Sequence, residues 1–558
     1  MKLNVRLIGL FLLHFFLLKN VVFAQDAPKR ELRGVWIATV LNIDYPSVQT
    51  TDEYTLKTNW VNILNKHKEM GLNALFVQVR PCADALYKSN LVPWSVYLTG
   101  QSGLAPANGF DPLAYMIETA HAMGFEFHAW LNPYRTAMDN QEPNFFHESH
   151  VMRQHPEWCF KYGKRYIMNP GIPEVRGHVQ MVVEELVKNY DLDGIHFDDY
   201  FYPYKIAGQE IPDYQAFQQY NDGYTNLEDW RRHNNDLLIY ALSKTIKQIK
   251  PRCQFGISPF GVWRNQSRDT EGSATQAGLT CYDDLYADVR KWCREGWIDY
   301  VVPQVYWTIG FSIAEHKTIV EWWSRNAGKT PIYVGHGAYR LGQGSSREPA
   351  WSDRSEIGRQ ILFGRQTPNV RGSIYFSSKS LTTNLLSIGD TFRMNYYRYP
   401  SLLPQIIKDT ALLACEPPEL RSVTPEENAV VIRWKPSLRT TRRLPFQYVL
   451  YRFTNGQVDY TDGKNIIAIV GHDSKDLAWR DTNVVRDINY TYAVTVIDCG
   501  QNESPSSDAI SIGKKLENTA TVEPTPSKPT KPIDPNFKNG EKSKKVSCWR
   551  RFWRGIFG

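Results

Sequence analysis

The sequence predicts an α/β protein: a (β/α)8 TIM barrel followed by an all-β sandwich. Two observations carry this prediction. Short β-branched runs alternate with amphipathic helical stretches from Glu31 to about Tyr397, and after about Cys415 the helical period stops. Alternating β and α units predict a parallel sheet covered by helices, whereas short strands without helices between them predict a sandwich.

Eight strand candidates fall in the first region and are separated by helical segments. We expect strands over residues 32–40, 74–80, 125–132, 194–198, 254–258, 300–306, 332–336 and 373–377. We expect helices over 55–70, 112–123, 173–190, 227–249, 282–295, 314–326 and 355–365, with an eighth near 384–397. This is the count of a closed barrel. A doubly wound open sheet competes, but no Gly-rich nucleotide loop follows the first strand.

The remaining segments suggest an exported protein with a modular end. Residues 1–24 have the basic start, apolar run and small-residue cleavage site of a signal peptide, and an uncleaved anchor helix is the alternative. The barrel is expected over 25–410 and the sandwich over 415–515, with strands at 429–434, 446–453, 466–470 and 490–497. Residues 516–545 form a Pro/Thr/Lys-rich linker. The basic aromatic tail, 546–558, is either a peripheral membrane contact or a solvated terminus.

Charge and cysteine content exclude some function classes. The net charge of +7 is modest for 558 residues, and part of it lies in the tail, so we expect no nucleic-acid partner. The eight cysteines contain no C-x-x-C pair and no compact metal pattern. Export permits disulfides, but the sequence leaves their pairing open.

Strand parity selects the side chains that face the barrel axis. Alternate residues of a strand point to opposite faces, and apolar residues mark the face toward the helices. The opposite parity collects polar and aromatic residues: Gln78, Arg80, Glu126, His128, Trp130, Asn132, His196, Asp198, Gln304, Tyr306, Tyr375 and Ser377. Many lie at the carboxyl ends of strands, where barrel enzymes build their active sites.

Asp198 is the first catalytic candidate because it ends the fourth strand and faces the axis. Glycoside cleavage requires two carboxyl groups in different protonation states. We expect Asp198 to act as nucleophile or base, kept ionised by Arg80 or His196. Asp199 has the opposite parity, so it joins the site only if the strand has already ended; helix capping or loop fixation is its alternative role.

Other readings of the polar residues stay open. The second carboxyl group is Asp199, Asp84, Asp283 or Asp284, whereas Asp288, inside the fifth helix, is assigned to structure. His128 and His196 could ligate a metal with Asp198, but inward histidines on neighbouring strands more often form hydrogen-bonded layers. We therefore expect neither a metal nor a cofactor. Aromatic side chains near the rim are candidate sugar platforms, although each alone is typical of core packing: Trp130, Tyr200, Tyr202, Trp263, Tyr306 and Trp307.

These motifs also resemble a known family. Residues 31–37, 129–135, 193–203, 285–288, 296–300 and 303–307 resemble the glycosyl-hydrolase-like 10 family, most specifically in the string Asp-Asp-Tyr-Phe-Tyr-Pro at 198–203. The resemblance implies a barrel glycosidase that acts on peptidoglycan glycan strands, including strands already stripped of peptides. From the family motif we nominate only Asp198 and Asp199 as catalytic. The expected substrate-binding residues are Arg80, His128, Trp130, Asn132, Arg135, His196, Tyr200, Tyr202, Trp263, Gln304, Tyr306 and Trp307.

The sandwich also has a resemblance, and two other functions compete. Residues 417–511 resemble a fibronectin type III domain, with Trp434 as the core tryptophan and Tyr490 or Tyr492 as the tyrosine corner. Such domains are usually spacers or docking modules. The alternatives to cell-wall hydrolysis are a hydrolase of dietary or host polysaccharide and a non-catalytic wall-binding scaffold.

Overall fold

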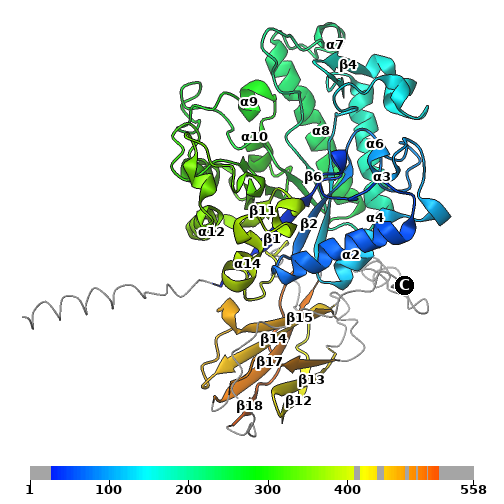
Figure 1. The fold of residues 1–558 in the computed structure, drawn as a ribbon. Helices are drawn as coiled ribbons and strands as arrows, with labels where there is room; N and C mark the ends of the chain where they lie inside the picture. Colours follow the sequence, from blue (N-terminus) through cyan, green and yellow to red (C-terminus); the bar gives the residue numbers. More distant parts are fainter. Residues whose placement is uncertain are drawn as a thin grey trace, which may run out of the picture.

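The computed structural model describes residues 27–406, 415–436, 445–471, 477–485, 488–498 and 500–513. Within them the chain forms a parallel barrel and, below it in Figure 1, two small antiparallel sheets. The expected signal peptide (1–24), linker (516–545) and tail (546–558) lie outside the described residues.

The barrel is a closed parallel sheet in which eight strand positions follow one another in chain order, one of them formed by two short strands. Its strands are β1 (Leu32–Ile37), β2 (Ala74–Arg80), β3 (Glu126–Leu131), β6 (Gly194–Phe197), β7 (Gln254–Ile257), β8 (Tyr300–Val301) with its continuation β9 (Gln304–Val305), β10 (Ile332–His336) and β11 (Val370–Tyr375). The barrel closes because β11 pairs with both β10 and β1. Pro303, which has no N–H to donate, separates β8 from β9. The TIM-barrel prediction is confirmed.

Helices cover the outer face of the barrel (Figure 1). The long ones are α2 (Glu53–Glu69), α4 (Pro112–Ala122), α6 (Pro173–Asn189), α8 (Leu227–Ile249), α11 (His316–Asn326) and α12 (Glu356–Gln366), each within two residues of the expected bounds. Several begin at a capping side chain. Asp52, Asp111 and Asn226 accept hydrogen bonds from backbone N–H groups of the first turns of α2, α4 and α8.

The single helix expected over 282–295 is wrong. The chain forms α9 (Cys281–Asp284) and α10 (Val289–Arg294), and between them Tyr286 has a φ of 51°, which ends a right-handed helix. Asp288 is therefore not inside a helix. It is the N-cap of α10, accepting hydrogen bonds from Lys291 N at 3.2 Å and Trp263 Nε1 at 2.9 Å. Asp288 therefore has a structural role, as predicted, but as a helix cap and not as a residue inside a helix.

Short elements fill the connections between strands and helices. They are η1 (Val40–Asn42), α3 (Val96–Thr99), η2 (Ala107–Gly109), η3 (Pro143–Phe145), α5 (Val151–Gln154), η4 (Pro156–Trp158), β4 (Cys159–Tyr162), β5 (Arg165–Met168), α7 (Tyr214–Gln219), η5 (Ala338–Arg340), η6 (Pro349–Ser352), α13 (Ser378–Thr382), η7 (Leu385–Ser387), α14 (Ile388–Thr391) and η8 (Phe392–Tyr396). The eighth helical segment expected near 384–397 is thus the broken run from η7 to η8.

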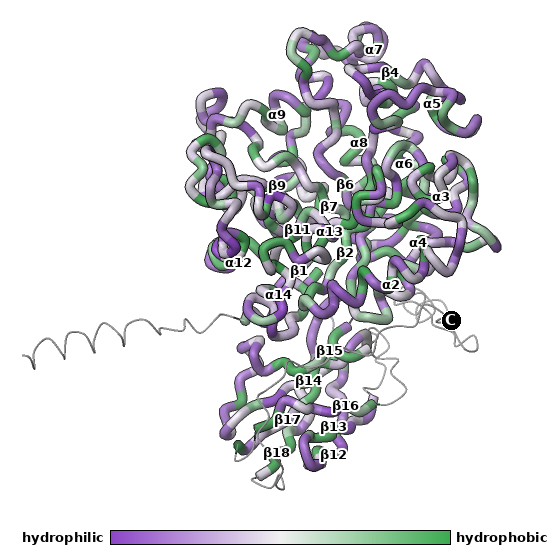
Figure 2. Tube along the Cα trace, in the orientation of Figure 1, coloured by the Kyte–Doolittle hydropathy of each residue, from purple (hydrophilic) through white to green (hydrophobic). Residues whose placement is uncertain are grey.

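Two apolar clusters confirm most of the parity reading. Helix-facing strand residues such as Val35, Val77 and Ile195 belong to a large buried cluster shared with the helices. Axis-facing residues such as Trp36 and Trp130 belong to a second cluster inside the barrel. The prediction for β11 is wrong: Ile374 belongs to this inner cluster, whereas Tyr375 belongs to the helix-facing cluster and packs on Phe392. Figure 2 shows hydrophobic stretches along the central strands and also along the helices that surround them, mixed with hydrophilic ones.

The second strand departs from simple alternation. The pairing of β2 with β3 shifts by one residue between Gln78 and Arg80. Gln78 lies opposite Trp130, which faces the axis, whereas Arg80 lies opposite Leu131, which belongs to the helix-facing cluster. Because a bulge changes which face the following residue occupies, the parity prediction for Arg80 is wrong.

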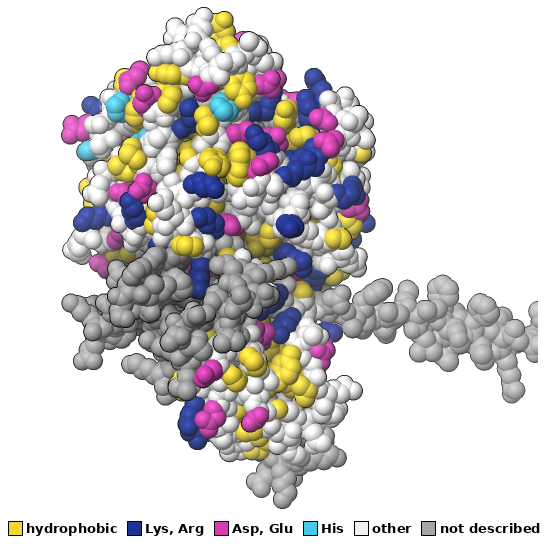
Figure 3. Space-filling view, turned by 180° about the vertical axis from the view of Figure 1, so that it is seen from behind, with side chains coloured by type: hydrophobic (Ala, Val, Ile, Leu, Met, Phe, Trp, Pro, Cys, Tyr) yellow, Lys and Arg dark blue, Asp and Glu magenta, His cyan; other side chains and the backbone are white. Residues whose placement is uncertain are grey.

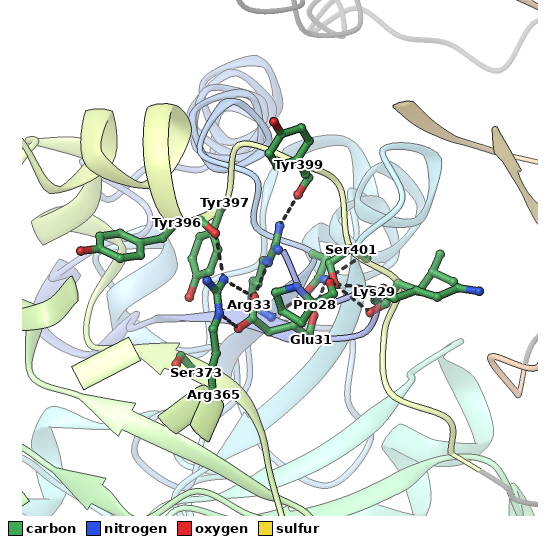
Figure 4. Close-up of polar contacts among 12 residues, drawn as sticks. Pro28, Lys29, Glu31, Arg33, Arg365, Ser373, Tyr396, Tyr397, Tyr399 and Ser401 are labelled. Carbon is green, nitrogen blue, oxygen red and sulfur yellow. Dashed lines mark hydrogen bonds and ion pairs between the residues drawn. The ribbon is translucent and has the colours of Figure 1, made fainter. Parts of the chain in front are cut away.

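A buried ion triad fastens the amino-terminal end of the barrel (Figure 4). The Glu31 carboxylate accepts from Arg33 Nε at 2.9 Å and from Arg365 Nε of α12 at 2.7 Å. Arg33 also donates to the Tyr399 carbonyl and Arg365 to the Tyr396 carbonyl. Burial alone would raise the pKa of Glu31, but the two guanidinium groups lower it overall. The triad joins the first strand to α12 and to the chain that leaves the barrel.

The second part contains two antiparallel sheets. One orders its strands as β12 (Glu419–Glu426), β13 (Ala429–Lys435) and β16 (Ala478–Asp481); the other as β15 (Ile466–Gly471), β14 (Pro445–Thr454), β17 (Tyr490–Asp498) and β18 (Ile510–Ile512), with η9 (Gly463–Asn465) before β15. The sheets share one apolar cluster, in which the rings of Trp434 and Tyr448 are 5.6 Å apart. Four strands match the expected positions. The partly exposed β12, β16 and β18 were not predicted, because their sequences lack a continuous apolar run.

The antiparallel sheets lie against the amino-terminal end of the barrel. Pro28 forms a β-bridge with Asp462, and Lys29 Nζ lies 2.6 Å from the Glu503 carboxylate. Leu402, where the chain leaves the barrel, belongs to an apolar cluster of the four-stranded sheet. Both ends of the barrel chain therefore contact the second part. Figure 3 shows acidic and basic side chains interspersed over the rear face of the barrel.

Candidate active site

Two carboxyl groups lie at the carboxyl end of β6. Asp198 is 4% exposed and Asp199 is 2% exposed. Asp198 continues the axis-facing parity of the strand, as expected. Because β6 ends at Phe197, strand alternation no longer directs Asp199 toward the helices. The structure therefore brings together the two residues nominated as catalytic.

Three N–H groups approach Asp198. Trp130 Nε1 donates to Oδ2 at 3.1 Å, and Asn132 Nδ2 donates to the same oxygen. Oδ1 has one longer contact, from the backbone N of Tyr200 at 3.4 Å. Oδ2 of Asp198 therefore accepts two side-chain N–H groups, whereas Oδ1 has only the longer backbone contact. Trp130 and Asn132 were both predicted as site residues.

The pKa of Asp198 is raised from 3.8 to about 7. Burial is the largest cause and the neighbouring Asp199 adds to it, while Arg135 opposes them. The expectation that Arg80 or His196 keeps Asp198 ionised is therefore wrong. The range near neutrality is where a carboxyl group can give and take a proton in catalysis.

Asp199 has a different set of partners. The Tyr204 hydroxyl donates to its Oδ2, and Gln304 also hydrogen-bonds to the carboxylate. Burial raises the pKa of Asp199, while these two hydrogen bonds and the charge of Arg135 counteract the rise. Both members of the pair thus resist ionisation, and together they hold a proton more readily than free carboxyl groups.

Arg135 and Gln304 occupy the places expected of site residues. Arg135 donates from Nη2 to Asn132 Oδ1 and from Nε to the Pro81 carbonyl at 2.9 Å. Its guanidinium lies over the ring of Tyr200, 5.4 Å from the centroid. Gln304 donates from Nε2 to the Ser258 carbonyl at 2.8 Å. Both side chains therefore brace the carboxyl pair.

Arg80 does not line the site. It is fully buried, and its Nη1 donates to the carbonyls of Asn132 at 2.6 Å and Pro133 at 3.2 Å. Burial lowers the pKa of Arg80, and Tyr87, Asp84 and Cys82, in the connection after β2, oppose this effect. The bulge in β2 has turned Arg80 behind the strand ends, where it supports the backbone that carries Asn132.

The two histidines form a hydrogen-bonded layer inside the barrel. His128 Nδ1 and His196 Nδ1 both contact the Tyr300 hydroxyl, at 3.0 and 3.2 Å. His196 Nε2 accepts from Trp36 Nε1 at 3.1 Å. Burial, with the neighbouring His128, holds the pKa of His196 well below its ordinary value, so this imidazole is neutral. Neither histidine contacts Asp198 by a hydrogen bond that the structure describes, and the layer reading fits both.

No cluster of three or more His, Cys, Asp or Glu side chains within the described ranges has the arrangement of a metal site. The other carboxyl candidates stand apart. Asp84 accepts from Cys82 N at 2.8 Å. Asp283 pairs with Arg264 and Asp284 with Lys205. Of the candidates for a second carboxyl group, Asp199 is the one that the structure pairs with Asp198.

An arc of aromatic rings borders the carboxyl pair, from the loop after β6 to the end of β11. Neighbouring ring centroids are 5.4 to 6.4 Å apart from Tyr200 to Trp307 and 5.9 to 6.3 Å apart among the last three rings, and the peptide bond between Tyr306 and Trp307 joins the two groups. The arc contains, in order, Tyr200, Tyr204, Phe260, Trp307, Tyr306, Tyr339 and Phe376. Tyr204 and Tyr339 are 39% and 38% exposed. Faces of such rings are suited to the C–H faces of sugars.

Two predicted platforms lie elsewhere. Tyr202 is 1% exposed and packs on Tyr286 at 5.1 Å. Trp263 is buried and stacked on Trp322 of α11 at 5.4 Å. Both belong to the outer apolar cluster and are structural. Their positions in connections, where strand parity gives no direction, explain the errors.

Several site residues were missed. Gln78 was recognised as axis-facing but not assigned to the site, yet it donates to Asn132 Oδ1 at 2.6 Å. Tyr204 directly follows the family string at 198–203, and this position was the sequence signal that its hydroxyl lies near Asp199. Phe260, Tyr339 and Phe376 follow the ends of β7, β10 and β11, and that position was the available signal for all three.

Comparisons with known proteins identify the family. The model of the glycosyl hydrolase-like 10 family matches residues 31–353. Glycosyl hydrolase YngK of Bacillus subtilis strain 168 is 42% identical over 510 residues, covering 90% of this chain and 98% of that protein. Glycosyl hydrolase DigH of Escherichia coli K12 is 37% identical over 366 residues, covering 62% and 82%. Among solved structures, alpha-L-fucosidase isoenzyme 2 from Paenibacillus thiaminolyticus has 15% identity and a TM-score of 0.40, covering 65% of this chain and 49% of that one. The chain therefore belongs to the glycosyl hydrolase-like 10 family and is a glycoside hydrolase.

Proposed function

We propose that this protein is exported and hydrolyses glycosidic bonds in peptidoglycan glycan strands, including strands stripped of their peptides. The observation that carries the proposal is the buried pair Asp198–Asp199 at the carboxyl end of β6, beneath the aromatic arc. Two carboxyl groups that share protons near neutrality can protonate the leaving oxygen and stabilise the oxocarbenium-like transition state. The family membership argues against a non-catalytic scaffold.

Asp198 is the proton donor in this proposal. Its raised pKa keeps it protonated up to about pH 7. Because Oδ2 already accepts two N–H groups, the proton belongs on Oδ1. This assignment replaces the nucleophile or base role expected from the sequence. After the leaving sugar departs, the Asp198 carboxylate takes a proton from water.

Asp199 is the ionised partner. The Tyr204 hydroxyl and Gln304 stabilise its carboxylate. It provides the negative charge, or the nucleophilic oxygen, at the reacting carbon. In this proposal the sugar rings rest on the aromatic arc, which includes Tyr306 and Trp307.

The second part and the export signal complete the proposal. We assign the antiparallel sheets to a fibronectin type III-like spacer, supported by their three-plus-four strand arrangement. Tyr490, at the start of β17, accepts from Val485 N at 2.8 Å, as a tyrosine corner does. Residues 1–24 supply the signal peptide composition. Among the described residues, no helix has the length and apolarity of a membrane span.

The test compares Asp198→Asn and Asp199→Asn with the unaltered protein on purified peptidoglycan, intact and amidase-treated. Mass spectrometry of soluble products gives the bond cleaved. Loss of a positioned proton donor or of its partner lowers the rate by about 100-fold or more. Asp198→Asn retains more activity on aryl glycosides, whose leaving groups need no proton, whereas Asp199→Asn loses both activities.

Three outcomes contradict the proposal. Unchanged release of fragments by Asp198→Asn removes this residue from the chemistry. If both variants lose the same activity on aryl glycosides, Asp198 is not the proton donor with Asp199 as its ionised partner. Cleavage of plant or host polysaccharides, with none of either peptidoglycan preparation, replaces the substrate class.

A further inference from the structure

The amide of Gln78 has only one orientation that satisfies its surroundings. Its Oε1 accepts from the backbone N of Thr39 at 3.0 Å and of Val40 at 2.9 Å. Because a backbone N–H can only donate, the atom facing these two groups is the oxygen. Gln78 is fully buried, so the connection after β1 fixes its amide without competition from water.

This orientation determines that of the next amide. The Gln78 nitrogen, which can only donate, lies 2.6 Å from the side chain of Asn132, so the atom facing it is Asn132 Oδ1. Arg135 Nη2 donates to the same oxygen and reinforces the choice. The Asn132 nitrogen must then face Asp198 Oδ2. Two backbone N–H groups beyond β1 thus specify, through two amides, a donor at Asp198.

We propose that Gln78 is a positioning residue for the hydrolysis, acting through Asn132 to keep the acidic proton of Asp198 on Oδ1. With Oδ2 held by Asn132 and by Trp130, a proton on that oxygen would meet two N–H groups and have no acceptor. The inference rests on the proposed function, in which Asp198 donates a proton to the leaving oxygen. Gln78 itself touches no substrate.

The test is Gln78→Met, which keeps the side-chain length and removes both amide atoms. Without the hydrogen bond from Gln78, the Asn132 amide is free to rotate, and its hydrogen bond to Asp198 Oδ2 weakens. Ionised Asp198 is then less stabilised, and Oδ2 can also carry the proton. We expect kcat to fall about 10-fold and the alkaline limb of the kcat/KM profile to move up by about half to one pH unit, because the hydrogen bond from Asn132 to the charged carboxylate is weakened and not lost. A merely structural defect lowers activity without moving the limb.

Two further variants separate the relay from general damage. Asn235→Leu removes another fully buried amide, one that donates to the Tyr286 carbonyl at 2.8 Å from α8, and the limb stays in place. In an Asn132→Ala background, Gln78→Met moves the limb no further, because the relay is already cut. An unmoved limb in Gln78→Met, or an equal movement in both backgrounds, overturns the proposal.

Two additional measurements keep the test decisive. If Gln78→Met fails to fold, Gln78→Leu removes the same two amide atoms without adding a titratable group, and the limb moves up by a similar amount. If the unaltered protein cleaves no glycan, the proposed function fails. The relay is then tested by carbon-13 NMR titration of the Asp198 carboxyl group, whose pKa rises in Gln78→Met if the relay exists and stays fixed if it does not.

Discussion

Burial of Asp198 carries a cost in stability that Asp198→Asn removes. The rise in its pKa from 3.8 to about 7 is about three pH units. At 1.36 kcal/mol per unit this corresponds to roughly 4 kcal/mol, and because Asp199 shares the titration we expect about 2–4 kcal/mol. Asparagine has the same shape, and its oxygen can accept from Trp130 and Asn132. The variant is therefore more stable than the unaltered protein where the carboxyl group is ionised.

The sign of the effect follows from proton binding. A carboxyl group with a raised pKa in the folded state binds its proton more tightly there than in the unfolded chain. Its contribution to stability is complete below about pH 4 and is lost as the pH rises through about 7. The advantage of Asp198→Asn consequently grows from near zero at acidic pH to its full value at about pH 8.5.

Urea unfolding followed by tryptophan fluorescence, at about pH 4 and about pH 8.5, measures this difference. Asp193→Asn is the matched control, at the position before β6. His121 and the backbone N of Phe127 lower the pKa of Asp193 despite its burial, so its removal destabilises the protein at alkaline pH. An advantage of Asp198→Asn that is absent at alkaline pH, or independent of pH, refutes the reasoning.

Two other predictions concern side chains that stabilise an ionised carboxylate. Arg365→Ala leaves buried Glu31 with one partner and lowers the free energy of unfolding by about 3 kcal/mol in urea titrations; a change under about 1 kcal/mol would contradict the triad's role. Tyr204→Phe removes a donor from ionised Asp199, so the acid limb of the kcat/KM profile moves up by about one pH unit. The exposed Tyr240→Phe serves as its control, and an acid limb that stays in place rejects this part of the site.

Much of the fold was predictable because most barrel strands carry a continuous apolar face toward the helices, while their polar residues lie mainly on the other face. The alternation in residues 125–132 and 194–198 correctly directed Trp130, Asn132 and Asp198 toward the axis. Because β6 ends before Asp199, strand alternation does not direct this side chain away from the site, and the aromatic loop that follows was a usable sign that the strand stops there. Sequence pattern sufficed wherever regular strand geometry continued to the site.

The failures come from places where that geometry is interrupted. A one-residue shift in β2 turned Arg80 away from the axis, and no local residue marks the bulge. Tyr202 and Trp263 lie in connections, so their burial depends on helices packed against them from distant parts of the chain. The ionised state expected for Asp198 is wrong for the same reason. Parity placed Arg80 and His196 beside it, whereas burial raises its pKa by more than Arg135 lowers it.

The attachment of the antiparallel sheets to the amino-terminal end of the barrel has a geometric consequence. The carboxyl pair lies at the opposite pole, at the carboxyl end of β6, away from these contacts of the second part. Among the described residues, the attachment of the second part and the carboxyl pair therefore occupy opposite ends of the barrel, and a change at one end leaves the contacts at the other in place.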